Sequence, residues 1–227
     1  MRTLPLIPIA LAWLLGAPVC AGAVELAQGG ARYVLPLTSL KEIRFRTTMR
    51  QQYDFSCGSA AVATLLSHHY GYRVTEQQVF AAMYLHGEQQ KIRKEGFSLL
   101  DVQRFLAGIG FQADGFELPL DKLVQARLPA IVLVAEKGYS HFVVIKGVAD
   151  GRVLIGDPAN GTRALPRPAF EAIWRNKLLF VIHDHAGAVR FNSEDDWRAA
   201  PSAPVAQAIN RAGLDTLTLA KRGPGDF

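Results

Sequence analysis

Three side chains in this sequence have the chemistry of a thiol hydrolase, and each stands where a rigid element begins or ends. Cys57 opens an alanine-rich stretch of helical character, and the unpaired N–H groups at a helix start favour a thiolate. His141 opens a β-branched run, and Asp157 closes the next one. On neighbouring antiparallel strands a carboxylate can hold an imidazole in one tautomer. We therefore expect Cys57 as nucleophile, His141 as general base and Asp157 as the acid that orients it.

Each of these residues also has a plainer interpretation. A cysteine among alanines is often a small, buried core residue. A histidine at a strand end can simply contact solvent, and the Asp-Pro pair at 157–158 can form a turn with no catalytic role. For the histidine or the aspartate alone, the plainer interpretation is the better one. The three residues together favour catalysis.

A side-chain amide six residues before the cysteine is a further candidate. Gln51 lies in a segment that we expect to run extended beside the helix start. An amide N–H there can donate to the oxyanion of a tetrahedral intermediate, a contribution of about 10²–10³ in rate. Gln52 is the competing candidate, and a surface glutamine is the alternative interpretation of Gln51.

Residues 1–23 have the features of a signal peptide. Arg2 gives a positive start, residues 4–16 are apolar, and residues 21–23 are a small Ala-Gly-Ala cleavage site. Val19 stands where a lipoprotein signal would have a small residue. An uncleaved N-terminal anchor is the alternative interpretation. We expect export to the periplasm with cleavage of the signal.

Export makes the remaining cysteine unusual. Of the two cysteines, Cys20 lies in the signal peptide, so Cys57 is the only one expected in the mature protein. Exported proteins generally use cysteines in pairs, as disulfides. A lone thiol in an oxidising compartment therefore indicates that its reactivity is used.

The composition argues against several other classes of protein. The chain has 25 Lys+Arg and 20 Asp+Glu, a formal net charge of +5, and no block of five like charges that would indicate nucleic-acid binding. No second long apolar stretch follows the first, so we expect a soluble mature chain with one core.

His183 and His185 have an i, i+2 spacing, but no third ligand is visible. We therefore expect no metal, no cofactor and no ATP.

Helical patterns fill the first half of the chain and β-rich runs the second. Gly-bearing turns separate the runs, and Asp150-Gly151 is the pair expected in a tight hairpin. Helices followed by an antiparallel sheet predict an α+β fold. Residues 24–48 suggest a short strand or an extended arm, and the polar segment 87–96 suggests a loop. The expected helices are at about 57–70, 75–85, 98–108, 120–126 and 170–174, and the expected strands at about 111–113, 130–134, 141–145, 153–155 and 178–182.

As a set, the candidate residues resemble the signatures of the C39 peptidases. These are papain-like cysteine proteases, best known as N-terminal domains of bacteriocin exporters that remove double-glycine leaders. The resemblance covers about residues 47–183 and implies a papain-like fold, with N-terminal helices packed on a C-terminal antiparallel sheet. It also implies the roles given above to the candidate residues. The matching motifs, in the family's order, are Gln51, Cys57-Gly58-x-Ala60, His141-Phe142-Val143-Val144 and Asp157-Pro158-x-x-Gly161.

Two features depart from the exporter domains. Ser56 precedes the nucleophile, where exporter domains often carry an acid. We also expect a signal peptide and no transmembrane or ATPase portion. It is more similar to the stand-alone exported C39 proteins, among them the one encoded with bacterial functional-amyloid secretion systems. Whether a double-glycine leader is its substrate stays open.

The expected organisation has four parts: a signal peptide (1–23), an N-terminal arm (24–46), a C39-like peptidase domain (47–185) and a C-terminal extension (186–227). We expect the extension to be partly helical or disordered, and residues 205–220 could form one amphipathic helix. The expected function is that of a periplasmic cysteine endopeptidase that cuts an exported protein or peptide by acyl-enzyme chemistry. A component of a secretion or amyloid system is the candidate substrate or partner. Two alternatives stay open, an acyltransferase with the same triad and a non-proteolytic peptide-binding or adaptor module of a secretion system.

Overall fold

The computed structural model describes residues 23–28, 31–36, 38–136, 138–185 and 189–201. The chain divides into two compact units, residues 1–39 and residues 40–227. In the first unit, β1 (Ala23–Gln28) and β2 (Ala31–Pro36) pair as an antiparallel hairpin. The strand expected in the arm is therefore present, paired with a second one. The expected signal peptide, except Ala23, and the helix expected near 205–220 lie outside the described residues.

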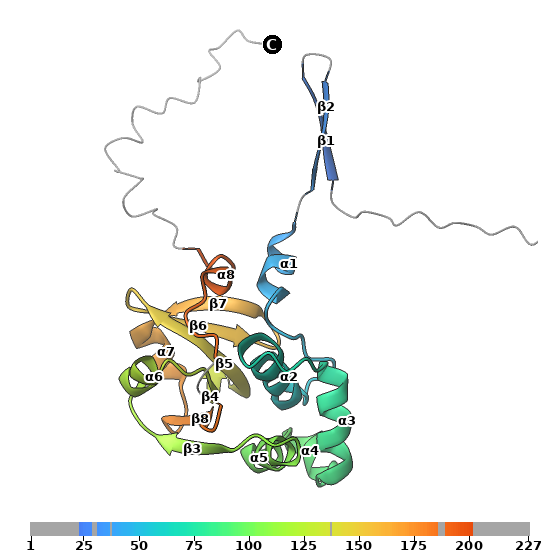
Figure 1. Ribbon diagram of the computed structural model, residues 1–227. Helices are drawn as coiled ribbons and strands as arrows, with labels where there is room; N and C mark the ends of the chain where they lie inside the picture. Colours follow the sequence, from blue (N-terminus) through green and yellow to red (C-terminus); the bar gives the residue numbers. More distant parts are fainter. Residues whose placement is uncertain (1–22, 29–30, 37, 137, 186–188, 202–227) are drawn as a thin grey trace, which may run out of the picture. The chain divides into compact units, whose positions relative to one another are not determined.

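The helical part of the second unit is built around α2 (Cys57–Thr64), all of whose residues are buried. The chain continues from it without interruption as a π-helical turn, η1 (Leu65–His69). The helix expected over 57–70 is thus confirmed, with a widened last turn. Helix α2 contacts α3 (Glu76–His86) and α5 (Leu99–Gly108), and α4 (Gln89–Glu95) contacts α3 (Figure 1). Helix α1 (Leu40–Phe45) precedes this group in the chain.

Two capping boxes fix where α3 and α5 begin. The N–H of Gln78 donates to Oγ1 of Thr75, and the N–H of Thr75 donates to Oε1 of Gln78. Ser98 and Asp101 form the same reciprocal pair at the start of α5. Each box satisfies N–H groups that a helix start leaves unpaired. Both helix starts therefore agree with the sequence prediction.

A six-stranded antiparallel sheet, in the order β3-β8-β4-β5-β6-β7, forms the second layer. Asp150 and Gly151 connect β5 to β6 with φ of 50° and 68°, as the predicted tight turn requires. The strands are β3 (Ala113–Glu117), β4 (Ala130–Glu136), β5 (Tyr139–Ala149), β6 (Arg152–Asp157), β7 (Gly161–Pro166) and β8 (Leu178–Ile182). The remaining helices are α6 (Leu120–Ala126), α7 (Arg167–Ile173) and α8 (Glu194–Trp197).

Several elements differ from the sequence prediction. Helix α1 lies in the segment 24–48, which was expected to be a short strand or an extended arm. The prediction of a loop over 87–96 is wrong, because this segment contains helix α4. Ile92 is buried and anchors this otherwise polar helix. The strand expected over 111–113 begins only at Ala113 and continues to Glu117. Strand β7 was not expected, since its sequence lacks the β-branched run of its neighbours; pairing along the whole of β6 stabilises it.

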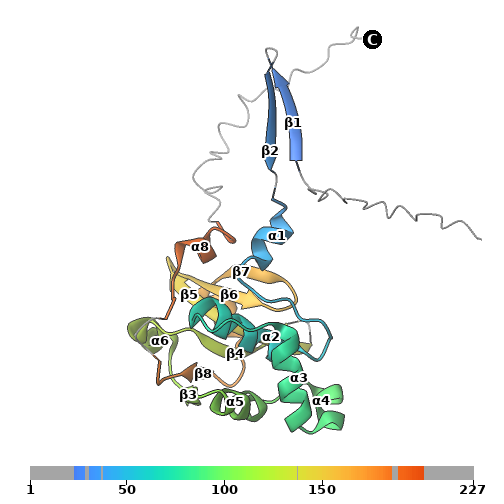
Figure 2. The same ribbon diagram turned by 45° about the vertical axis from the view of Figure 1, so that its right-hand side comes forward.

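Side chains of the sheet alternate between two buried clusters, one on each face. In β5, Phe142 and Val144 join the cluster that contains α2, α3 and α5, whereas Val143 and Ile145 join the cluster that contains α6 and α7. Figure 2 shows α2 lying against β5 and β6, which it contacts. This packing brings the first turn of α2 to the strand ends that carry His141 and Asp157.

The chain also packs back on the domain after the last strand. Phe191 is buried in the cluster that contains α6 and α7, and α8 follows it. Within the described residues, no helix combines the length and the hydrophobicity needed to cross a bilayer.

Candidate active site

Cys57 is the first residue of α2, and its side chain is 6% exposed. Ser56, which precedes it, is buried; its Oγ donates to the carbonyl oxygen of Tyr53 and accepts the N–H of the same residue. A Cβ on Gly58 would lie 2.9 Å from Cβ of Phe97. The nucleophile candidate thus stands on a turn fixed by hydrogen bonds before it and by close packing after it.

The surroundings of the Cys57 thiol act on its pKa in opposite directions. Burial raises the pKa, the N–H groups of Phe142, Gly58 and Cys57 itself lower it, and the Asp157 carboxylate raises it, so that the pKa is raised in sum. The N–H groups at the helix start thus favour the thiolate, as the sequence predicts, but in the resting site the cost of desolvation outweighs them. The thiol needs a base to take its proton.

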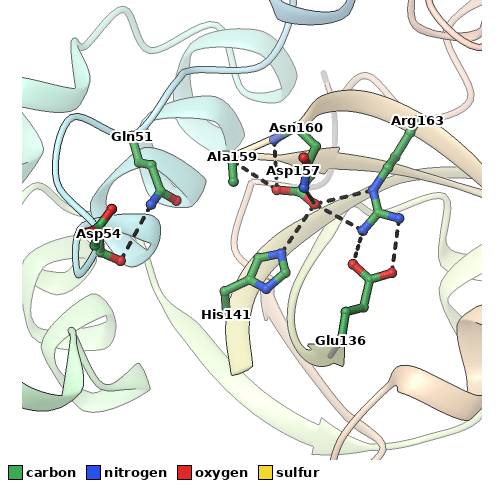
Figure 3. Close-up of polar contacts among 8 residues, drawn as sticks. All are labelled: Gln51, Asp54, Glu136, His141, Asp157, Ala159, Asn160 and Arg163. Carbon is green, nitrogen blue, oxygen red and sulfur yellow. Dashed lines mark hydrogen bonds and ion pairs between the residues drawn. The ribbon is translucent and has the colours of Figure 1, made fainter. Parts of the chain in front are cut away.

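His141 and Asp157 form a buried pair. Nε2 of His141 lies 3.2 Å from Oδ2 of Asp157, and the two residues are 4% and 0% exposed (Figure 3). The other ring nitrogen, Nδ1, is buried and has no hydrogen-bond partner in the part of the chain that the structure describes. No hydrogen bond joins it to Cys57 among the described residues, but the neighbouring N–H of Phe142 acts on the thiol. The backbone of Phe142, the next residue after His141, therefore lies close to the thiol, and one nitrogen of the His141 ring is held by Asp157.

Both oxygens of Asp157 accept several hydrogen bonds (Figure 3). Oδ1 accepts the N–H groups of Ala159 at 2.9 Å and Asn160 at 3.2 Å. Oδ2 accepts Nε2 of His141, Nδ2 of Asn160 at 3.0 Å and Nη2 of Arg163 at 3.0 Å. Burial raises the pKa of the Asp157 carboxyl, but the bonds from His141, Asn160 and Ala159 outweigh it and hold the pKa well below its usual range. The ionised carboxylate can therefore stabilise an imidazolium at His141.

A second carboxylate is connected to the site through Arg163. The Arg163 guanidinium in β7 bridges Asp157 to Glu136 at the end of β4. Glu136, His141 and Asp157 offer ligand atoms within 4.8 Å of one another, but the guanidinium already supplies a positive charge between the two carboxylates. Sequence reasoning missed Arg163 and Glu136, because 27 residues separate them and no motif links them.

Gln51 is held at the edge of the site. Its backbone N–H donates to the carbonyl oxygen of Pro158 at 3.1 Å, next to Asp157. Its Nε2 donates to the carbonyl oxygens of Tyr53 at 3.1 Å and Asp54 at 3.5 Å, and its Oε1 is buried without a partner. The amide is therefore turned toward the loop that leads into α2. To donate to an oxyanion it must release the longer of these two bonds.

An open groove with a volume of about 720 Å³ runs beside His141. Its walls carry both signs of charge and come from α1, α7 and the ends of three strands. The lining residues are Arg44, Ala135, Glu136, Tyr139, His141, Ala159, Asn160, Arg163 and Ile173. Gln52, the competing candidate for the oxyanion role, is exposed and lines a different groove.

His183 and His185 do not share a ligand set. Nε2 of His183 lies 2.8 Å from Asp114, and Nδ1 of His185 lies 2.7 Å from Asp184. Among the described residues, neither histidine belongs to a group of three side chains that could hold a metal ion.

Comparison with known proteins gives consistent matches. Residues 46–186 match the model of the peptidase C39 family. The chain is 38% identical over 187 residues to the "Probable functional amyloid protease FapD" of Pseudomonas fluorescens, across 80% of this chain and 82% of that protein. It is 37% identical over 182 residues to the protein of the same name from Pseudomonas aeruginosa, across 80% of each chain.

One solved structure shows the same fold. It is the peptidase domain of Streptococcus ComA, a bi-functional ABC transporter involved in a quorum-sensing pathway. The TM-score is 0.50 at 22% identity, and the match covers 60% of this chain and 97% of that domain. The predicted α+β, papain-like fold, with helices packed on an antiparallel sheet, is therefore confirmed.

Proposed function

The chain belongs to the peptidase C39 family and is a cysteine peptidase, and we propose that it works in the periplasm on an exported component of a functional-amyloid system. The observation that carries the catalytic part is the state of the His141 ring, whose Nε2 is bound to Asp157 while Nδ1 is buried and unoccupied. The relatives named as functional amyloid proteases support the substrate class. The signal-peptide features of residues 1–23 support the compartment.

In the first step, Nδ1 of His141 takes the proton of the Cys57 thiol, and Sγ attacks the carbonyl carbon of the scissile peptide bond. The imidazolium that forms is stabilised by the ionised Asp157. Because burial raises the pKa of the thiol, little thiolate forms without this transfer. His141 is therefore required to generate the nucleophile.

The carbonyl oxygen then carries a negative charge near the first turn of α2. The N–H groups of that turn have no acceptor within the helix and can donate to this oxygen. The side chain of Gln51 supplies a further donor once it releases the carbonyl oxygen of Asp54, its longer bond at 3.5 Å. Donors fixed in advance around a developing charge lower the barrier of acyl transfer.

Collapse of the intermediate completes the acylation. The imidazolium of His141 gives its proton to the leaving amine, the C–N bond breaks, and a thioester remains on Sγ of Cys57. The leaving segment departs on the side of the proton donor, where the groove beside His141 is open. A water molecule, deprotonated by His141, hydrolyses the thioester and restores the thiol.

The proposal is tested by comparing the exported proteins of two strains, one with the wild-type chain and one with Cys57→Ala. We expect at least one amyloid-system protein to keep an uncut terminus in the variant strain and to be cut by the purified wild-type protein. If all termini are the same in both strains, the assignment to an exported substrate is wrong. A product that carries a new amide in place of a free carboxylate would identify acyl transfer instead.

The compartment has its own test. A periplasm-activated reporter fused after residue 23 should be active with residues 1–23 in front of it and inactive without them. Equal activity of the two fusions would contradict export through this segment.

A further inference from the structure

The segment that follows the family match is bound to the catalytic domain by main-chain hydrogen bonds. The match ends at residue 186, and residues 190–200, here called the C-terminal strap, come directly after it. The N–H of Arg190 donates to the carbonyl oxygen of His69 at 3.0 Å, and the N–H of Asn192 donates to that of Lys146 at 3.0 Å. Between them, Phe191 is buried in the core. The strap therefore joins the end of η1 to the middle of β5.

Asp196 of the strap forms a buried ion pair with Lys146. Nζ of Lys146 lies 2.5 Å from Oδ1 of Asp196, and the two side chains are 0% and 5% exposed. Lys146 follows four apolar residues of β5 and is among the largest fully buried side chains of the domain. A charged ammonium is tolerated in such a place only when it is paired and hydrogen-bonded. Asp196 supplies the compensating charge.

The other two bonds of this ammonium group go to one residue, Thr47. Nζ of Lys146 donates to the carbonyl oxygen of Thr47 at 2.6 Å and to its Oγ1 at 2.7 Å. Thr47 Oγ1 in turn donates to Oδ1 of Asp196 at 2.5 Å. All three donors of the lysine are thus used. The strap, the centre of β5 and Thr47 form one closed polar cluster.

Thr47 begins the segment that ends at the candidate oxyanion donor, Gln51. The residues between are fixed from both sides of the domain, by α2 on one side and by β7 and the turn after β6 on the other. These contacts join Oγ1 of Thr48 and Oγ1 of Thr162 at 2.7 Å, the N–H of Met49 and Oγ1 of Thr64 at 2.8 Å, and the N–H of Gln51 and the carbonyl oxygen of Pro158 at 3.1 Å. Residues 47–51 therefore form a continuous segment, held by hydrogen bonds, that links the buried ion pair to the candidate oxyanion donor.

We propose that the C-terminal strap is a positioning element of the peptidase, in which Asp196, through Lys146 and Thr47, sets the place of Gln51 for oxyanion stabilisation. The inference rests on the proposed catalytic function and extends it to a residue outside the family match. Without the carboxylate, Lys146 keeps a buried charge with no counter-charge and is drawn away from Thr47. A displacement of about 1 Å in a catalytic group can lower the rate by about 10².

Two probes of Cys57 separate this role from a general loss of structure. Acylation by p-nitrophenyl acetate passes through a tetrahedral oxyanion, so its rate depends on Gln51 as well as on the thiol and His141. Alkylation by iodoacetamide displaces iodide from a saturated carbon and forms no oxyanion. A positioning role through Gln51 therefore lowers the first rate and leaves the second unchanged.

In the full-length protein, Asp196→Asn is expected to lower the acylation rate about tenfold or more, with the alkylation rate within about twofold of wild type. Asp195→Asn is the matched control, because its side chain is 58% exposed and pairs at the surface with Arg46 and Arg198. This control should keep both rates. If Asp196→Asn lowers both rates together or changes neither, the positioning role is wrong.

A double variant tests whether the effect passes through Gln51. Gln51→Ala with Asp196→Asn should acylate no more slowly than Gln51→Ala alone, because residues that act as one unit are not additive. Effects that multiply would place Asp196 outside this route and would contradict the proposal. Failure of the underlying function looks different, since Cys57→Ala would then hydrolyse the ester as fast as wild type.

A second substitution guards against loss of the fold. Lys146→Met with Asp196→Leu removes both charges and keeps apolar volume, a replacement that buried ion pairs often tolerate. It no longer anchors Thr47, so it should fold, as measured by circular dichroism, and show the same split between acylation and alkylation. If this variant and Asp196→Asn both fail to fold, the strap is a folding element and the positioning proposal is wrong.

Discussion

Nε2 of His141 and Oδ2 of Asp157 lie 3.2 Å apart in the interior. This hydrogen bond makes the two nitrogens of the imidazole ring chemically different. Since Nε2–H is held by the carboxylate, Nδ1 is the nitrogen that can accept a proton. It is buried, and no described residue forms a hydrogen bond with it. The ring is therefore oriented before any substrate arrives.

Removal of the Asp157 oxygen should cost more activity than removal of its charge. Asp157→Asn keeps an oxygen that can accept Nε2–H, so we expect it to retain more turnover of p-nitrophenyl acetate than a variant without this oxygen. Asp157→Ala leaves the ring unoriented, and the expected loss is about 10³–10⁴. Equal losses in the two variants would show that orientation by this bond is not its function.

Alkylation of Cys57 should reveal a base-assisted thiol. At about pH 6, the wild-type protein should react with iodoacetamide at least tenfold faster than a free thiol of pKa about 8.5, because His141 takes the proton. In His141→Ala, burial keeps the thiol pKa raised, so the rate should fall at about pH 6 and recover only in alkaline solution. A rate that is unchanged in His141→Ala would remove His141 from this role.

The oxyanion role should belong to Gln51 and not to its neighbour. Gln51→Ala should lower the acylation rate by about 10²–10³ while the iodoacetamide rate stays unchanged. Gln52→Ala is the control, since this residue is exposed and lines a different groove. The reverse ranking of the two variants would reassign the donor.

Stability should depend on pH through His69. Burial first, and the positive charge of Lys146 second, lower its pKa to about 4, against the hydrogen bond to the carbonyl oxygen of Arg190 and the charge of Asp196. The unfolded histidine titrates near pKa 6.5. Between these values the unfolded chain binds a proton that the folded chain does not, so the contribution is complete above about pH 6.5 and is lost as the pH falls toward 4, by up to about 3 kcal/mol.

The measurement is the melting temperature at about pH 7.5 and pH 4.5. His69→Gln, which can still donate to Arg190, should lose less stability than wild type over this interval, whereas His86→Gln on the exposed end of α3 should follow wild type. An identical decrease in wild type and His69→Gln would contradict this assignment.

The sequence predicted those parts of the fold and site that are encoded locally. Capping residues such as Thr75 and Ser98 identify helix starts because they act within one turn. The relation of His141 to Asp157 could be predicted because a two-residue hairpin turn joins their strands. Helix α4 and strand β7 were missed, since both are stabilised by contacts with distant elements and have weak patterns of their own.

The polar clusters could not be predicted from spacing. Arg163 and Glu136 meet across a sheet whose strand order is not visible in the sequence. Asp196 and Lys146 come from parts of the chain that no motif connects. One signal was available: a lysine directly after the apolar run of β5 indicates a buried cation that needs a partner. The identity of that partner requires the structure.

The order of the strands has a consequence for the proposal that this peptidase acts on a component of an amyloid system. Strands β3 and β7 are the outer strands of the sheet, and an open outer strand is a template on which a fibril-forming chain could add. Strand β3 is only five residues long and contains Asp114 and Glu117, while β7 ends at Pro166 and is contacted by α1. Short length, charge, proline and a covering helix each discourage strand addition. If the proposed substrate is an aggregating chain, these features oppose its addition to the sheet of the peptidase.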